Sequence, residues 1–259
     1  MNKLPLINVA FWVMKICATT LGETAGDLLS MTLNVGYAMS SVILVGFFLV
    51  TLVSQLATHR YHPLLYWSVI LSTSTAGTTM SDYMDRTLGL GYATGSALLV
   101  GILAVIFVAW RVAGYSMAVQ EIRTRRVEML YWTAILFSNT LGTALGDFLA
   151  DDSGLGFAGG AMLVGGLLVV VVALACWTRI SKVFLFWVAF VLTRPFGATM
   201  GDVLTKSKDK GGLDFGTVGA SAILASVLLA CIVLVTIQLR RLRAAEAAEC
   251  PATVPGLDG

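Results

Sequence analysis

Long apolar runs separated by short polar connections fill almost the whole chain. Each run is long enough to cross about 30 Å of hydrocarbon as an α-helix that rises about 1.5 Å per residue. The pattern predicts helices at residues 7–29, 36–57, 64–84, 91–113, 129–150, 156–177, 183–204 and 216–239. We therefore expect an all-α polytopic membrane protein with eight transmembrane helices, whose first partner is the lipid bilayer.

Composition leads to the same class. Of the 259 residues, 57% are hydrophobic and 12% are charged, whereas a soluble domain carries about 25% charged residues. The chain has too few polar side chains to cover a water-facing surface, and we therefore expect most of its surface to face lipid. The short connections leave no room for a separate soluble domain, and no nucleic-acid partner is expected.

Basic residues are divided unevenly between the two sets of connections. Eleven Lys and Arg residues lie at the amino end, after the second, fourth and sixth predicted helices and in the carboxyl tail. The opposite connections hold four, Arg86, Lys206, Lys208 and Lys210. By the positive-inside rule, this distribution predicts that both termini lie in the cytoplasm.

A fourfold internal repeat is the most specific signal in the chain. A tryptophan stands fifteen residues before an aspartate four times, with a glycine five residues before each aspartate. The tryptophans are Trp12, Trp67, Trp132 and Trp187, and the aspartates are Asp27, Asp82, Asp147 and Asp202. The glycines are Gly22, Gly77, Gly142 and Gly197.

The spacing of the repeats predicts a two-helix unit that has been doubled twice. We expect a first half at residues 1–125, a second half at 126–243 and a disordered cytoplasmic tail at 244–259. Units that each cross the membrane twice share one orientation, so the repeats should be parallel and related by an axis along the membrane normal. Closure around that axis would bring the four aspartates to one depth, near the outer end of each odd-numbered helix.

On these tryptophan-marked repeats, the chain resembles an uncharacterised family of bacterial membrane proteins with four tandem two-helix repeats. The resemblance covers about residues 7–240 and implies a bacterial inner-membrane location, without an activity to carry over. The segment from Glu23 to Ser30 also looks partly like the Glu-x-Gly-Asp motif of a manganese and calcium exchanger family. It departs from that motif by one extra residue before Gly26 and by Leu28 at the basic position.

Polar residues spaced four apart form a stripe on each odd-numbered helix, and positions four apart share a helix face. The stripes lead to the four aspartates and include Lys15, Thr19 and Glu23; Ser74 and Thr78; Asn139 and Thr143; and Arg194. Exposing charges to lipid costs a few kcal/mol each, so these faces should line the bundle interior. Together with neighbouring hydroxyls such as Thr24, the carboxylates offer the oxygen ligands that hard cations prefer.

The stripes are not equivalent, which favours one specialised site over a symmetric pore. Glu23 and Asp27 are the leading candidates for metal ligands or proton carriers, with Asp82, Asp147 and Asp202 beside them. Lys15 and Arg194 are candidate internal counter-ions whose pairings change during transport. The alternative interpretation is that the aspartates only tie the turns between helices, while the glycines and tryptophans serve packing.

The leading hypothesis for function is transport of a small cation, a divalent metal such as manganese, by efflux or exchange coupled to protons. The alternatives are a cation channel through a pseudo-fourfold pore and a structural or regulatory membrane protein that transports nothing. The sequence contains no ATP-binding loop and no catalytic constellation, so we expect neither an enzyme nor a cofactor beyond the transported cation. Association with further copies of the chain stays an open alternative.

Overall fold

The computed structural model describes residues 5–58, 60–122 and 124–249, and in these residues the chain is all-helical. They form eight long α-helices: α1 (Val9–Asp27), α2 (Tyr37–Ala57), α3 (Pro63–Asp82), α4 (Tyr92–Val112), α5 (Arg125–Asp147), α6 (Gly156–Trp177), α7 (Lys182–Thr205) and α8 (Gly216–Glu249). Five short helical turns join them: η1 (Leu28–Thr32), η2 (Tyr83–Thr87), η3 (Val119–Glu121), η4 (Phe148–Asp152) and η5 (Lys208–Lys210). The predicted all-α class is confirmed.

Local capping decides several of the helix ends. The side chains of Asn8, Thr124 and Ser181 accept hydrogen bonds from the first turns of α1, α5 and α7, which satisfies otherwise unpaired backbone donors. The cap at Thr124 explains why α5 begins earlier than the apolar run at residue 129 predicted. The predicted tail is partly wrong, because α8 continues past Arg243 to Glu249. The rest of that tail, 250–259, lies outside the described residues.

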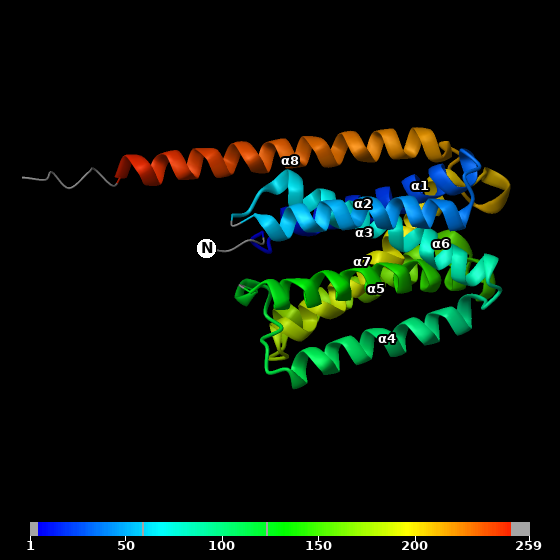
Figure 1. The fold of residues 1–259 in the computed structure, drawn as a ribbon. Coiled ribbons are helices and arrows are strands. Elements are labelled where there is room, and N and C mark those ends of the chain that lie inside the picture. Colours follow the sequence, from blue (N-terminus) through cyan, green and yellow to red (C-terminus); the bar gives the residue numbers. More distant parts are fainter. Residues whose placement is uncertain (1–4, 59, 123, 250–259) are drawn as a thin grey trace, which may run out of the picture.

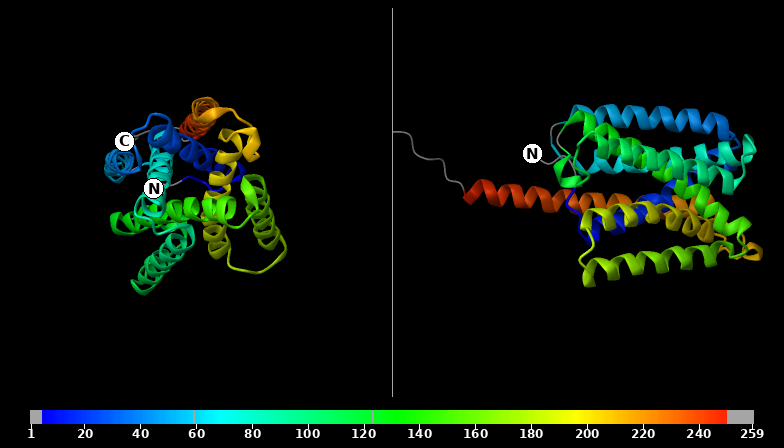
Figure 2. Two further views of the ribbon diagram at one scale, coloured as in Figure 1. Left: turned by 90° about the vertical axis from the view of Figure 1, so that its right-hand side faces the viewer. Right: turned by 90° about the horizontal axis from the view of Figure 1, so that it is seen from below.

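The odd-numbered helices form a closed inner ring. α1 packs against α3, α3 against α5, α5 against α7, and α7 against α1. The even-numbered helices cover this ring, each packing mainly on the inner helix of the following repeat: α2 on α3, α4 on α5, α6 on α7, and α8 back on α1. The end-on view of Figure 2 shows the outer helices around the inner ones, and Figure 1 shows the start of α1 and the end of α8 at the same end of the bundle.

Inner and outer helices differ in composition as their positions require. Within the described residues, five helices are long and apolar enough to cross a membrane: α2, α4, α6, α7 and the segment Gly216–Leu242 of α8. Side chains of the outer helices, such as Val42, Val105 and Val169, are exposed on the bundle surface. α1, α3 and α5 fall short of this apolarity because their polar stripes are turned into the ring, where these side chains are buried.

The repeated tryptophans lie in an aromatic layer that closes around the inner ring. In each repeat an aromatic residue directly precedes the tryptophan, and its ring contacts the tryptophan of the next repeat. The ring centroids are 5.7 Å apart for Phe11 and Trp67, 5.6 Å for Tyr66 and Trp132, 6.0 Å for Tyr131 and Trp187, and 5.7 Å for Phe186 and Trp12. The four contacts are equivalent, so this layer follows the fourfold repeat closely.

The repeated glycines stand where neighbouring inner helices approach most closely. A Cβ added at Gly77 would lie 2.9 Å from the backbone nitrogen of Thr140 in α5, and one at Gly197 would lie 2.5 Å from Oγ1 of Thr19 in α1. Gly22 and Gly142 make the equivalent approaches to Ser74 and Arg194. Small residues at these positions allow the helix backbones to pack together, as is common between membrane helices.

Candidate functional site

Arg194 lies on the axis of the inner ring and is fully buried. Its guanidinium pairs with the Glu23 carboxylate at 3.0 Å and donates to the hydroxyls of Thr78 and Thr143, the latter at 2.7 Å. These partners come from α1, α3 and α5, and Arg194 itself comes from α7. One side chain therefore connects all four inner helices, and the stripes meet on the axis.

The shape of the fourth stripe makes this arrangement possible. The first three repeats place Glu23, Thr78 and Thr143 four residues before their aspartates, whereas the fourth has Ala198 there. The small side chain of Ala198 leaves space at that level, and Arg194 reaches into it from one helical turn below. Arg194 also donates to the backbone carbonyl of Ser74 at 3.3 Å, so its guanidinium is held from several sides.

Three carboxylates gather directly beside this arginine. Glu23, Asp147 and Asp202 each offer an oxygen within 4.8 Å of the other two, and all three side chains are buried. This group differs from the expected pair of ligands, because it contains Glu23 but has Asp147 and Asp202 in place of Asp27. Carboxylates this close repel one another strongly in a medium of low dielectric constant, so they require cations or shared protons between them.

Two basic residues lie over the four aspartates at the ends of the inner helices. Nε of Arg86 is 3.0 Å from Asp82, and another nitrogen of the same guanidinium is 3.4 Å from Asp147. Nζ of Lys206 is 3.1 Å from Asp202 and 3.4 Å from Asp27. Each basic residue thus bridges its own repeat to a neighbouring one, and the four aspartates form two pairs, each sharing one cation.

The charge of Lys206 is maintained by these neighbours. Burial lowers the pKa of Lys206, but the carboxylates of Asp202 and Asp27 raise it, and the result lies above the ordinary value for lysine. The ammonium therefore stays protonated between the two aspartates.

Lys15 lies on the same axis below Arg194 and has a different environment. It is fully buried, and its Nζ has no hydrogen-bond partner among the described residues. The ammonium lies 3.9 Å from the centroid of the Phe190 ring, an arrangement that stabilises a cation weakly. Arg194 forms an ion pair with Glu23, whereas Lys15 is paired with no described carboxylate in this conformation.

The other predicted polar residues are only partly drawn into the site. Thr78 and Thr143 bond directly to Glu23 and Arg194, and the backbone carbonyls of Thr19 and Ser74 accept from Arg194. Asn139 instead donates to Thr73 of α3 at 3.0 Å. Thr24 faces α8, where it bonds to Ser221 at 2.9 Å, so its hydroxyl is not part of the axial cluster.

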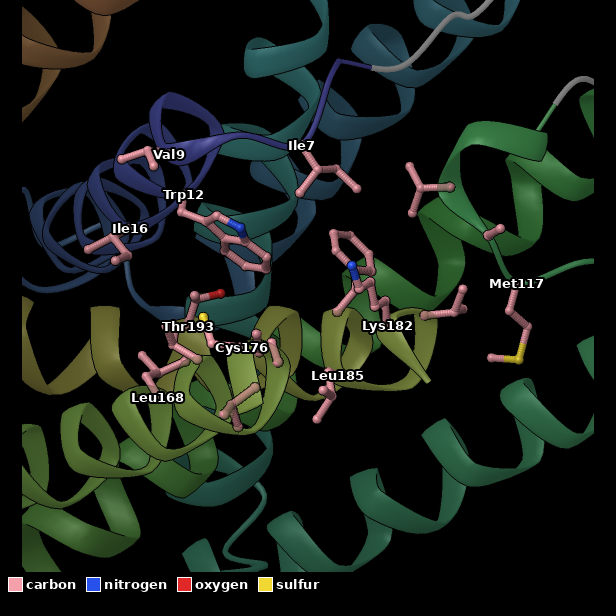
Figure 3. A pocket seen from close by; sticks show the side chains of 18 residues that line it. Ile7, Val9, Trp12, Ile16, Met117, Leu168, Cys176, Lys182, Leu185 and Thr193 are labelled. Carbon is pink, nitrogen blue, oxygen red and sulfur yellow. The ribbon is translucent and has the colours of Figure 1, made fainter. Parts of the chain in front are cut away.

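An apolar cavity of about 660 Å³ lies between helices of the bundle, and none of these carboxylates is among its lining residues (Figure 3). It is bounded by α1, α6, α7 and the connection after α4, and its lining includes Trp12, Ile16, Leu185 and Thr193. Because Trp12 lines this cavity, it is only partly buried, whereas the other three repeated tryptophans are buried. The lining contains no acidic side chain, so the cavity is distinct from the carboxylate group.

Comparison with known proteins gives a family for the chain. The sequence profile described as Repeat of Unknown Function (DUF347) matches it four times, at residues 10–61, 65–115, 130–181 and 185–241. The chain belongs to this repeat family. Each DUF347 repeat covers one inner helix and the outer helix that follows it, in agreement with the predicted repeat units. No curated protein and no solved structure matches the chain.

The DUF347 frame also identifies site residues that the sequence analysis overlooked. Arg86 and Lys206 were interpreted only as charges in outer connections. Each stands four residues after the aspartate of its repeat, in the second and fourth copies, where the other copies have Met31 and Asp151. Residues four apart share a helix face, so this spacing could have predicted that each basic residue contacts the aspartate of its own repeat. The contacts with Asp147 and Asp27 come from neighbouring helices and leave no such signal.

Proposed function

We propose that the chain is a multi-pass membrane protein in which four parallel two-helix repeats cross the bilayer eight times. The ordered contacts between inner helices support this arrangement: Gly22 and Gly26 approach Ser74 and Thr78 in the same order along α1 and α3. The apolar surface of the outer helices supports burial of the bundle in lipid. The excess of basic residues at one end supports cytoplasmic termini, in the inner membrane of a bacterium.

We propose further that the protein transports a small cation, a divalent metal, in exchange for protons. The observation that carries this proposal is the group of Glu23, Asp147 and Asp202, whose oxygens lie within 4.8 Å of one another in a buried site. Charges buried in a membrane protein are rare and are normally paired or placed on an ion pathway. Three oxygen donors at this spacing suit a hard divalent cation, and protons can take its place.

Basic side chains beside the carboxylates support a carrier over an open channel. The guanidinium of Arg194 fills the axis next to Glu23, and Phe190, Ile70 and Ile135 are fully buried below it. A permanent pore along the axis would require this column of side chains to be absent. A carrier needs only that the pairing of Arg194 with Glu23 changes as the cation enters and leaves.

Transport by purified protein in liposomes tests the proposal. We expect an imposed pH gradient to drive uptake of Mn²⁺, with Mg²⁺ and Ca²⁺ tested in parallel, and added metal to move protons in the opposite direction. Glu23→Gln and Asp147→Asn should each lower the rate by about tenfold or more, because each removes a ligand oxygen charge. Asp152→Asn, at an exposed position outside the site, is the matched control and should retain the wild-type rate. Equal rates in all three variants, or no movement of any of these metals by the wild type, would overturn it.

A further inference from the structure

We infer that Lys206 is a tethered cation that closes the outer end of the carboxylate site and is displaced by the entering substrate cation. This inference rests on the proposed transport function and concerns how the cation reaches Glu23, Asp147 and Asp202. Arg86 holds the opposite side of the aspartate ring and stays in place.

The four aspartates share two basic counter-ions, which are placed on opposite sides of the ring. Arg86 and Lys206 occupy equivalent positions in the second and fourth repeats, and each bridges two aspartates from neighbouring inner helices. Both side chains are partly exposed, 31% for Arg86 and 24% for Lys206, whereas the four aspartates below them are buried. The two basic side chains therefore lie between the buried carboxylates and the surroundings at this end of the bundle.

Arg86 is fixed by more than its two aspartates. Its guanidinium also donates to the hydroxyl of Tyr37 at 3.3 Å and lies 5.9 Å and 5.7 Å from the ring centroids of Tyr37 and Tyr92. A planar guanidinium held by carboxylates and aromatic rings loses several favourable contacts at once if it moves. This side of the ring is therefore suited to a permanent counter-ion.

Lys206 has a simpler environment that allows it to leave. In the described part of the chain, its ammonium is bonded only to Asp27 and Asp202. An ammonium is a compact point charge on a flexible stem, and a small cation can replace it between two carboxylates without other losses.

The backbone around Lys206 also differs from the other repeats. η1, η2 and η4 continue the first three inner helices, whereas α7 ends at Thr205 and Lys206 begins an extended connection with ψ of 155°. The connection from Lys206 to Phe215 packs back on the end of α7, where the backbone nitrogens of Leu213 and Phe215 donate to Val203 and Leu204. The lysine therefore lies at the junction of a rigid helix and an irregular segment.

Entry of a cation can then proceed without a net loss of pairing. The incoming cation takes the place of the ammonium between Asp27 and Asp202, and the ammonium moves toward water. From Asp202 the cation is beside Asp147 and Glu23, which complete its ligands. When the cation leaves, the ammonium returns, so the carboxylates are never left unpaired in a buried site.

Chemical labelling of the aspartates tests this assignment without requiring transport. The full-length protein in liposomes is treated with a water-soluble carbodiimide and an amine, and the modification rate of each aspartate is measured by peptide mass spectrometry. Lys206→Gln should raise the rates at Asp27 and Asp202 by about tenfold, as expected for the loss of two partly buried ion pairs. Rates at Asp82 and Asp147, under Arg86, should change little, and Lys208→Gln at an exposed neighbouring position should leave all four rates unchanged.

A conservative variant separates the gate from a merely structural role. Lys206→Arg keeps the charge, so its labelling rates should not exceed those of the wild type. In transport assays, Lys206→Gln should lower the KM for Mn²⁺, because the competing ammonium is gone, and should add a passive proton leak that Lys206→Arg lacks.

Two outcomes would overturn the assignment: unchanged labelling of Asp27 and Asp202 in Lys206→Gln, or an equal rise at all four aspartates. Failure of the wild type to move any metal would count against the proposed transport and against displacement of Lys206 by a substrate cation, whereas the labelling result would still decide whether Lys206 closes the carboxylate site.

Discussion

The contacts at one end of the inner ring follow the fourfold repeat, and the contacts at the other end depart from it. Near the start of the inner helices, the aromatic layer has four equivalent contacts with ring separations between 5.6 and 6.0 Å. Near their ends, the polar layers are unequal: Glu23 and Arg194 occur once each, and Arg86 and Lys206 only in alternate repeats. Packing preserves the symmetry, whereas charge breaks it. We conclude that the aromatic end is the scaffold and that specific chemistry belongs to the end where the copies differ.

The largest effect should come from removing the charge that joins the inner helices. Arg194→Met leaves Glu23 buried without its counter-ion, so the free energy of unfolding should fall by about 3–5 kcal/mol. Thermal unfolding in detergent measures this change. Arg179→Met, at an exposed position, is the control and should lie within about 0.5 kcal/mol of the wild type. Adding Glu23→Gln to Arg194→Met should recover part of the loss; a double variant less stable than the single one would refute the pairing.

Substitutions of the repeated tryptophans should lower the free energy of unfolding by similar amounts, except at Trp12. Trp132→Ala should lower the free energy of unfolding by about 3 kcal/mol, because the side chain is fully buried against Tyr66 and Tyr131. Trp12→Ala should cost about half as much, because Trp12 already lines a cavity. The same unfolding measurement compares the pair. Equal losses would mean that the cavity beside Trp12 does not weaken its packing.

The sequence predicted the elements and faces of the inner helices better than their partners. Apolar runs fixed the eight helices to within a few residues over most of their ends, because local hydrophobicity decides them. The four-residue spacing also predicted that Glu23, Thr78 and Thr143 face inward, because it reflects helix geometry. Asn139 shows the limit, since its partner is Thr73 and not the axial cluster. Which side chain it meets depends on how α3 and α5 are rotated, and no local pattern records that rotation.

Outer helices illustrate the same limit at a larger scale. The repeat predicted two-helix units, but α2 packs mainly on α3 of the next unit and α8 on α1 of the first. That choice depends on the direction of the connections at the ends of the inner helices, which are π-helical after Asp27, Asp82 and Asp147 and begin with extended backbone at Lys206 after α7. The grouping of Glu23 with Asp147 and Asp202 has the same origin: all three were candidate site residues, but which of them come together is decided only when the ring closes.

The smallest effect should come from the repeated glycines, where neighbouring inner helices approach closely between the aromatic layer and the polar layers. Gly77→Ala places a Cβ 2.9 Å from the backbone nitrogen of Thr140 and 3.0 Å from Cβ of Asn139, so α3 and α5 must separate slightly. We expect a loss of about 1–2 kcal/mol, which is typical of one extra methyl group in a packed core. Gly46→Ala in α2 is the matched control, because nothing lies within 4 Å of its added Cβ and alanine favours a helix by up to about 1 kcal/mol. The two substitutions should therefore change the unfolding temperature in opposite directions. A stabilising Gly77→Ala would show that the inner helices can separate freely, and that the fourfold frame depends on the aromatic layer alone.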